Sequence, residues 1–339
     1  MIWLHVGLPK TGTSSIQAAL RLVTHRSGIA VWTIGDHPPP LSPQWSELLH
    51  TRADAGDVIV SDETLLGDPR DGYLDLPVRL DRLKTALAQL HVTVVLSLRR
   101  QPEWVESVYL QTLQEGAAWI GDEFYQRICT TGYLSWARLI TDLESALDPW
   151  PLRVLIHDPS RDSILDFFGL CGLERPPDVG APIKENVSIS ATQATIVRML
   201  NSQLSSDAQR KVRGFMQQVA GPAARSDASA LSPAVRASID AAYSQEWGLL
   251  LDELARKGRL APGLDPVTLG CWPASDRPYI GSGLGNPNVT DETIRIMSLA
   301  IDLIALPGEP TAFSRLRDKL RSNPADLPAA VLRSLRRRS

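Results

Sequence analysis

The sequence predicts an α/β fold: three layers (α/β/α) around a central parallel sheet of about five strands, with additional helices. Three observations support this prediction. Short apolar runs rich in β-branched residues alternate with helical patterns over the first 170 residues. The run HVTVVLSL at 91–98 is almost continuously apolar, as in a parallel strand buried on both faces. The first apolar run ends in a glycine-containing turn that opens directly into an amphipathic helix.

The strands and helices follow one another in the order that a doubly wound sheet requires. After the apolar run that begins at Ile2, strands are predicted at 29–34, 57–61, 91–98 and 152–157. Helices are predicted at 79–90, 103–115, 133–147 and 163–170. Prolines 38–40 exclude both helix and sheet, so a surface loop is expected there. Ligands of such folds bind at the carboxyl ends of the strands.

Composition indicates a globular protein with a sizeable core. The chain has 339 residues, of which 43% are hydrophobic and 22% charged, and its net charge of −3 gives no reason to expect nucleic acid as a partner. The cysteines Cys129, Cys171 and Cys271 are too widely spaced for a C-x-x-C metal site and suggest a reducing compartment. The sequence shows neither a signal peptide nor a membrane-spanning run, so a cytoplasmic location is expected.

The turn after the first strand, GLPKTGTS at 7–14, has the features of an anion cradle. Backbone N–H groups of such a loop, together with the N-terminus of the following helix, can surround a phosphate-like group. Lys10 supplies a cation, and Thr11, Thr13 and Ser14 supply hydroxyls. The loop is P-loop-like, but Thr13 stands where the ATP motif G-x-x-x-x-G-K-[ST] has its lysine. This difference argues against a magnesium-bound triphosphate.

The segment Lys10-Thr11-Gly12-Thr13-Ser14 resembles the K-x-G-T-[TS] core of the 5′-phosphosulfate loop of sulfotransferases. A second segment, VLSLRRQPEWVESVYLQ, resembles the element that holds the 3′-phosphate of their donor. In that family element an Arg is followed two positions later by Pro and eight positions later by Ser. Here Pro102 follows Arg100 by two positions, whereas Ser107 follows Arg99 by eight, so both arginines remain candidates. The resemblance covers about residues 1–190 and implies 3′-phosphoadenosine 5′-phosphosulfate (PAPS) as donor, adenosine 3′,5′-bisphosphate (PAP) as product, and no metal.

The resemblance also assigns roles to individual residues. The donor-binding residues that it implies are Pro9, Lys10, Thr11, Gly12, Thr13, Ser14, Arg99, Arg100 and Ser107. Lys10 is also the catalytic cation at the leaving oxygens. The general base that removes the acceptor proton is either Glu63, after the third strand, or His5, within the first strand. His157 ends the fifth strand, further from the cradle, and is expected to be structural.

The implied reaction is sulfuryl transfer to a hydroxyl of a carbohydrate or glycoconjugate. Residues 183–193, IKENVSISATQ, are similar to a segment of bacterial members that modify saccharides, although an Asn and Ser helix cap explains them equally well. Two other functions are considered: a P-loop kinase or NTPase, which predicts dependence on Mg²⁺, and a non-catalytic nucleotide-binding module, which predicts binding without turnover.

The resemblance and the sequence pattern together predict the domain organisation. Residues 1–275 form the sulfotransferase domain, with a helical cap region at 190–260; residues 276–290 form a linker; and residues 291–339 form a helical C-terminal extension. Residues 315–339 contain eight Arg or Lys and two Asp. This basic tail is a solvated helix face, a contact with an anionic membrane surface, or a partner-binding element.

Overall fold

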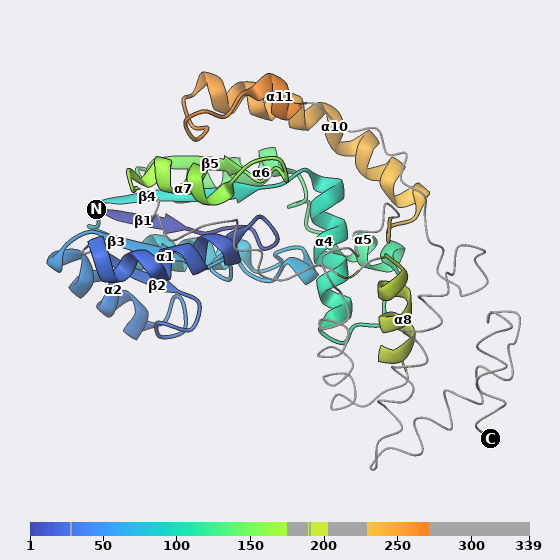
Figure 1. Ribbon diagram of the computed structural model, residues 1–339, viewed down its shortest axis with the longest axis horizontal. Helices are drawn as coiled ribbons and strands as arrows, with labels where there is room; N and C mark the ends of the chain where they lie inside the picture. The colour runs from blue at the N-terminus through green and yellow to red at the C-terminus, as the bar shows by residue number, and fades with distance from the viewer. Residues whose placement is uncertain (28, 175–188, 190, 203–228, 271–339) are drawn as a thin grey trace, which may run out of the picture. The chain divides into compact units, whose positions relative to one another are not determined.

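A computed structural model describes residues 1–27, 29–174, 189, 191–202 and 229–270 (Figure 1). The predicted linker at 276–290, the C-terminal extension at 291–339 and Cys271 lie outside the described residues, as does most of the segment 183–193.

Five parallel strands form one sheet in the order β2-β3-β1-β4-β5, as the sequence predicts (Figure 1). The strands are β1 (Ile2–His5), β2 (Ala30–Thr33), β3 (Val58–Ser61), β4 (Val92–Leu98) and β5 (Leu152–Ile156). Every residue of β3 and of β4 is buried, because helices cover both faces of the sheet. The first strand pairs with β3 on one side and β4 on the other, so it is central. The turn that follows it opens at the middle of the carboxyl edge of the sheet.

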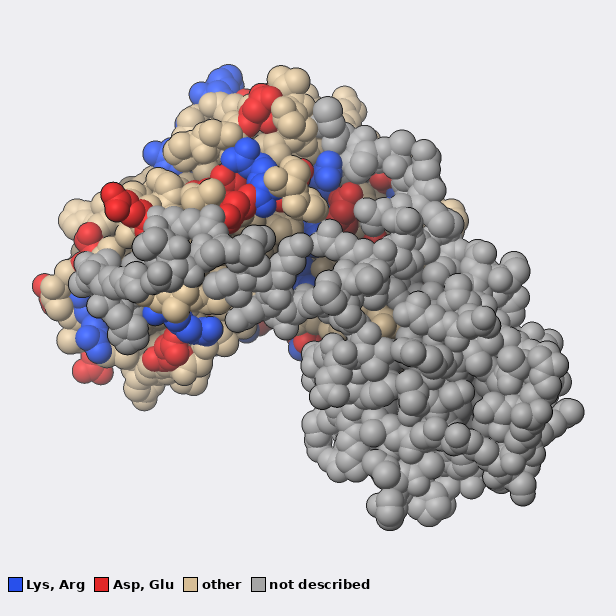
Figure 2. Space-filling model, viewed as in Figure 1, with Lys and Arg blue, Asp and Glu red and all other residues tan. Residues whose placement is uncertain are grey.

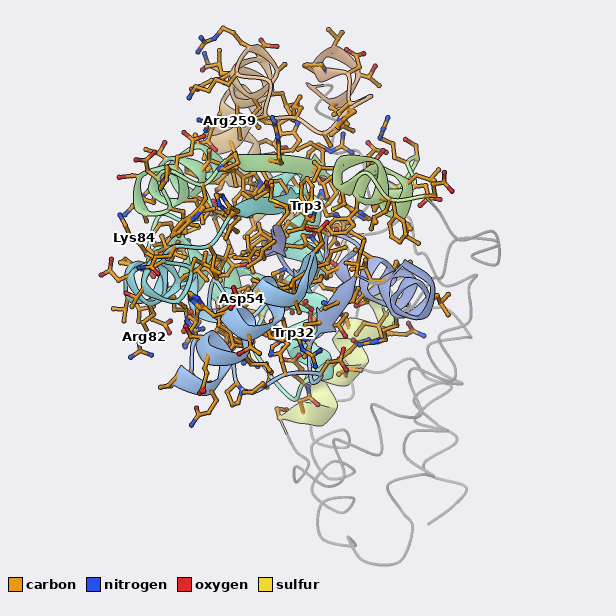
Figure 3. The ribbon with its side chains drawn as sticks, turned by 90° about the vertical axis from the view of Figure 1, so that its left-hand side faces the viewer. Trp3, Trp32, Asp54, Arg82, Lys84 and Arg259 are labelled. Atoms are coloured by element: carbon orange, nitrogen blue, oxygen red, sulfur yellow. The ribbon has the colours of Figure 1, made fainter. Side chains whose placement is uncertain are left out.

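Helices lie on both sides of the strands (Figure 3). The helix α1 (Thr13–Ser27) contacts α7 (Ser163–Cys171), and α3 (Leu76–Ala86) contacts α6 (Trp136–Ala146). Side-chain caps define several helix starts: the Ser135 hydroxyl accepts from the Arg138 N–H, and the Asp162 carboxylate accepts from the Ile164 and Leu165 N–H groups. The α/β prediction is confirmed, and its helices differ from these by a few residues at their ends.

Among the described residues, three α-helices and the short 3₁₀ helix η1 (Pro69–Asp71) were not predicted from the sequence. The helix α2 (Pro43–Ala55) begins directly after the proline-rich segment, where Ser42 caps the Trp45 N–H and Pro43 takes the first helical position. The other two are α5 (Gly121–Cys129) and α11 (Pro266–Gly270). The helix α2 was hard to predict next to the prolines at 38–40, because proline interrupts a helix but also favours its first position.

The chain divides into two compact units. The first comprises Met1–Trp104, Gln126–Asn186 and Ser238–Ala274, and the second comprises Val105–Tyr125, Val187–Ala237 and Ser275–Ser339. The long helices α4 (Gln101–Gln114) and α10 (Pro233–Arg256) have residues in both units, and α8 (Ala191–Asn201) belongs to the second. The predicted cap region 190–260 is divided between them; its extent stays a prediction.

Each unit holds a glutamate that links distant segments of the chain. In the first unit, Glu246 of α10 accepts a hydrogen bond of 2.6 Å from the Ser135 hydroxyl at the start of α6. In the second, the Glu106 carboxylate accepts from the Ser229 hydroxyl at 3.0 Å and lies 3.5 Å from the Arg236 guanidinium. The Glu106 side chain is buried and needs such partners, whereas Glu246 is half-buried. Both contacts link helix α10 to elements that precede it in the chain.

The surface of the described residues carries mixed charge. On the face that Figure 2 shows, Lys and Arg side chains alternate with Asp and Glu. Among the described helices, none combines the length and the apolar character needed to cross a membrane.

Candidate functional site: a cradle at the end of the central strand

The loop between β1 and α1 has the backbone geometry of an anion cradle. Three of its residues adopt positive φ angles: Gly7 at 61°, Lys10 at 66° and Gly12 at 87°. Left-handed residues that alternate with ordinary ones turn successive N–H groups toward one side, which creates a concave surface with positive partial charge. The helix α1 begins at Thr13, so its positive dipole end adds to this surface.

Both glycines of the cradle lie against other elements. A Cβ atom on Gly7 would lie 2.8 Å from Cβ of Glu63 and 3.0 Å from Cγ2 of Thr13. A Cβ atom on Gly12 would lie 3.1 Å from Oγ of Ser163 and 3.2 Å from Nδ1 of His157. The loop is therefore enclosed by the ends of β3 and β5 at positions where only glycine fits.

The position of His157 differs from the prediction, which placed it away from the cradle. His157 follows β5 and packs against Gly12, and its Nδ1 atom is 3.1 Å from the Ser163 hydroxyl at the start of α7. Its place at the carboxyl end of a parallel strand was the signal that could have identified it. Ser163 had no such signal, because only the packing of α7 beside α1 brings it to the loop.

Three carbonyl oxygens of the cradle accept hydrogen bonds from neighbouring side chains. The Thr11 hydroxyl donates to the Leu8 carbonyl at 2.5 Å, Nε1 of Trp104 donates to the Pro9 carbonyl at 3.0 Å, and Nη1 of Arg99 donates to the Lys10 carbonyl at 3.2 Å. Thr11 is buried and serves the loop itself. Among the predicted donor-binding residues, Lys10 and Ser14 are half-buried, and Thr13 is buried at the start of α1.

The two predicted arginines have different surroundings. The guanidinium of Arg99 reaches back to the cradle, and its own carbonyl accepts from Nε1 of Trp136 at 2.8 Å. Nε of Arg100 lies 3.7 Å from a carboxylate oxygen of Glu103, one turn along α4. Ser107 is buried on α4 within the second unit, and its role in donor binding stays a prediction.

Glu63 lies beside the cradle, as expected from its position after β3. Its side chain packs on Gly7, and its Oε2 atom accepts a hydrogen bond of 2.8 Å from Nε2 of Gln17. Burial raises the pKa of the Glu63 carboxyl, an effect that its own backbone N–H, Gln17 and the charge of Lys10 offset only in part. A half-buried carboxyl with a raised pKa next to a lysine is suited to receive a proton.

The turn that carries Glu63 is fixed by its neighbour Asp62. One oxygen of the buried Asp62 carboxylate accepts from the N–H and the hydroxyl of Thr64, at 2.8 and 2.7 Å. The other lies 3.4 Å from Nε2 of His37, whose Nδ1 is 2.8 Å from the Pro38 carbonyl. The Asp62 carboxylate raises the pKa of His37, which favours the ionised pair. Through His37 and Asp62, the proline-rich loop is thus attached to the turn that carries Glu63.

The environment of His5 favours a structural role. The ring is fully buried in the centre of the sheet, where Nδ1 lies 2.8 Å from the Ser61 hydroxyl of β3 and Nε2 lies 2.8 Å from the Ser97 hydroxyl of β4. Burial lowers the pKa of His5 to about 3. Since serines on the neighbouring strands hold both nitrogens, the geometry favours Glu63 over His5 as the base.

Replacement of His5 by leucine is expected to destabilise the protein without abolishing turnover. Two buried serine hydroxyls would lose their partner, at a cost of about 1–3 kcal/mol each. The wild type should lose stability as the pH falls from 6.5 toward 3. Between these values His5 binds a proton in the unfolded state but stays neutral in the folded protein. Urea unfolding across this range should show a flatter profile for His5→Leu. Full stability with loss of turnover would instead identify His5 as the base.

The described residues offer no group of three His, Cys, Asp or Glu side chains placed to hold a metal ion. The predicted absence of a metal stays a prediction.

Residues 4–148 match the family model described as "Sulfotransferase domain". This range contains the cradle, Glu63, both arginines and Ser107, and it ends just before β5. The searches of curated proteins and of solved structures gave no significant match.

Proposed function

Residues 4–148 form a sulfotransferase domain, and on this premise we propose that the protein transfers the sulfuryl group of PAPS to a hydroxyl of a carbohydrate or glycoconjugate. One observation carries the proposal: a loop with the backbone geometry of an anion cradle and a half-buried carboxylate lie side by side, because Glu63 packs directly on Gly7. Sulfuryl transfer needs both an anion site for the donor and a base for the acceptor.

The residues of the cradle fit a phosphate-like group. The positive φ angles at Gly7, Lys10 and Gly12 create the concave backbone, and α1 begins at its rim. The backbone N–H groups of Thr11 to Ser14 and the Lys10 ammonium would hold the 5′ end of the donor. PAPS supplies a sulfuryl group on a phosphate that leaves readily.

The chain itself contributes charge and proton transfer. The Lys10 ammonium stabilises the negative charge that develops on the leaving phosphate. Glu63 accepts the proton that the acceptor hydroxyl loses, and its raised pKa brings the carboxylate closer to the working pH of a base. Gly7 and Gly12, without side chains, allow the loop to pack closely against Glu63 on one side and His157 on the other.

A saccharide acceptor is favoured by the type of base. A carboxylate serves as the base in the saccharide-modifying members of the superfamily that the sequence resembles, and Glu63 would be such a base, whereas His5 is enclosed within the sheet. The kinase alternative lacks support at position 13, where threonine replaces the lysine of the ATP motif. A cytoplasmic location and a membrane contact through the basic tail stay predictions.

We assign the 3′-phosphate of the donor to Arg100. Arg99 binds the Lys10 carbonyl and so supports the loop, whereas Arg100 stands two residues before Pro102, as the family pattern requires. Burial tends to raise the pKa of Asp158, but hydrogen bonds from Ser160 and the charges of Arg100 and His157 lower it overall. The charge of Arg100 thus acts on Asp158, which follows β5, and the preceding residue His157 packs against Gly12 of the cradle.

Calorimetric titration without Mg²⁺ tests the donor and the arginines together. PAP should bind the wild type well and ADP poorly, since ADP has no 3′-phosphate. Arg100→Met should lower PAP affinity about 10–100-fold, the value of one charge-assisted contact, with little change for ADP. Arg99→Met should weaken both ligands because it loosens the loop. Tighter binding of ADP than of PAP, or binding of ADP only after Mg²⁺ is added, would favour the kinase class.

Turnover is tested with PAPS and three acceptors: methyl β-glucoside, chitobiose and p-nitrophenol. Transfer to either sugar but not to the phenol would support the saccharide class, and the reverse result would overturn it. PAP binding without transfer to any acceptor would favour the non-catalytic module.

A further inference from the structure

A buried glutamine of α1 bridges the end of β3 and the Glu63 carboxylate. Nε2 of Gln17 donates to the Ser61 carbonyl at 3.1 Å and to Oε2 of Glu63 at 2.8 Å. A carboxamide nitrogen carries two hydrogens, and these two bonds use both of them. The side chain is buried, with a relative exposure of 6%.

The position of Gln17 within α1 is one that packing alone would fill with an apolar residue. Ile16, Ala19 and Leu20 around it are buried against the rest of the unit. A buried carboxamide is costly unless its polar atoms are bonded, and here the bonded partner is the carboxylate beside the cradle. The helix that forms the cradle rim therefore also reaches the candidate base.

We infer that Gln17 is a positioning residue that orients the Glu63 carboxylate and stabilises its charged form; the inference rests on the proposed function. The carboxamide binds Oε2 and so fixes the orientation of the carboxylate that receives the acceptor proton. A hydrogen bond to an ionised group favours that ionised form, so Gln17 opposes the effect of burial on Glu63. The bond also couples the base to α1, whose first turn forms the rim of the cradle.

The other groups that act on Glu63 differ from Gln17 in kind. The loop contributes the charge of Lys10, which favours the carboxylate, and the turn after β3 contributes Asp62, which opposes it. The backbone N–H of Glu63 favours the carboxylate as well. Tyr73 lies close enough for the charge of Glu63 to raise the pKa of its phenol. Among these groups, Gln17 is the neutral side chain that donates a hydrogen bond to Glu63. Because it has no net charge, it neither attracts nor repels the anionic PAPS.

Two substitutions test the inference. Gln17→Leu removes the hydrogen bond, and Gln17→Glu keeps the shape but places a second carboxyl against Glu63, so that the two share a proton. Gln111→Leu is the matched control, because Nε2 of Gln111 donates to the exposed Glu115 at the same distance of 2.8 Å. Thermal unfolding identifies any variant that fails to fold.

The first readout requires no acceptor. Carboxyl ¹³C signals of labelled glutamates are titrated by NMR, and the signal absent from Glu63→Gln identifies Glu63. Its pKa should be higher in Gln17→Leu than in the wild type and higher still in Gln17→Glu, while Gln111→Leu leaves it unchanged. An unchanged Glu63 titration in both folded Gln17 variants would overturn the inference.

The second readout uses PAPS and the acceptor that turns over best in the panel. On the acid limb of the profile, kcat/KM of Gln17→Leu should fall about tenfold, the equivalent of about 1.4 kcal/mol for a lost bond to a charged group. The KM for PAPS should stay near its wild-type value. A loss of activity that is uniform across pH, without displacement of the limb, would contradict the positioning role. If the wild type transfers to no acceptor, the proposed function fails, whereas the NMR titration still decides the role of Gln17.

Discussion

Replacement of Lys10 by methionine is expected to lower sulfuryl transfer about 10²–10³-fold, the usual effect of removing one preorganised charge stabiliser. Methionine keeps an unbranched side chain of similar size and removes the ammonium. The contact that supports the loop should survive, because Arg99 binds the backbone carbonyl of Lys10 rather than its side chain. Transfer is measured at saturating PAPS and acceptor, so that the change reports on kcat.

Lys84 provides the control for this prediction. It is exposed on α3, away from the loop, and Lys84→Met removes the same charge (Figure 3). The kcat of Lys84→Met should lie within about a factor of two of the wild-type value. Surface substitutions of this kind usually change free energies by no more than about 0.5 kcal/mol. Wild-type kcat in Lys10→Met would show that the ammonium does not act at the leaving oxygens. A higher KM for PAPS with unchanged kcat would assign Lys10 to binding alone.

Replacement of Glu63 by glutamine should nearly abolish turnover while donor binding is kept. General base catalysis contributes about 10²–10⁴ in rate, and an amide cannot accept the acceptor proton. The amide oxygen can still accept the Gln17 hydrogen bond, so the turn should keep its shape. PAP affinity by calorimetry and transfer rate with PAPS separate the two effects.

The same substitution should stabilise the protein near neutral pH. Because the pKa of folded Glu63 is raised, the native state binds more protons than the unfolded state between the ordinary glutamate value and the raised one. Stability therefore falls as pH rises through this window, and Glu63→Gln removes that fall. Below the ordinary glutamate pKa the advantage should disappear. Glu115→Gln, which alters the exposed partner of Gln111, should change neither stability nor rate. If Glu63→Gln and the wild type were equally stable at all pH values, the pKa of the half-buried Glu63 carboxyl would not be raised.

The sheet and the cradle could be predicted because their signals are local. The apolar runs define the strands, and the order of glycines, Lys10 and hydroxyls between a strand and a helix defines the loop. Glu63 could be predicted from one topological rule, since it follows a strand that ends at the same edge. The positive φ angle at Lys10 had no signal, because lysine rarely adopts it.

The support of the site could not be predicted, because it depends on contacts between segments far apart in the sequence. Gln17 looks like any polar residue of an amphipathic helix until α1 is placed on β3. His157 and Ser163 reach Gly12 only through the pairing of β5 with β4 and the packing of α7 on α1. The separate roles of Arg99 and Arg100 likewise depend on a bond across 89 positions of the chain.

The hydrogen bonds to the loop carbonyls determine the polarity of the cradle. In a trans peptide the N–H points opposite to the C=O of the same unit. Trp104 holds the Pro9 carbonyl, and Arg99 holds the Lys10 carbonyl, so the N–H groups of Lys10 and Thr11 are directed to the other side. A peptide flip that presented oxygen to the anion would have to break one of these bonds. The dipoles of the loop are thus oriented during folding, and an incoming anion does little reorganising work, which favours both fast binding and discrimination against cations at this position.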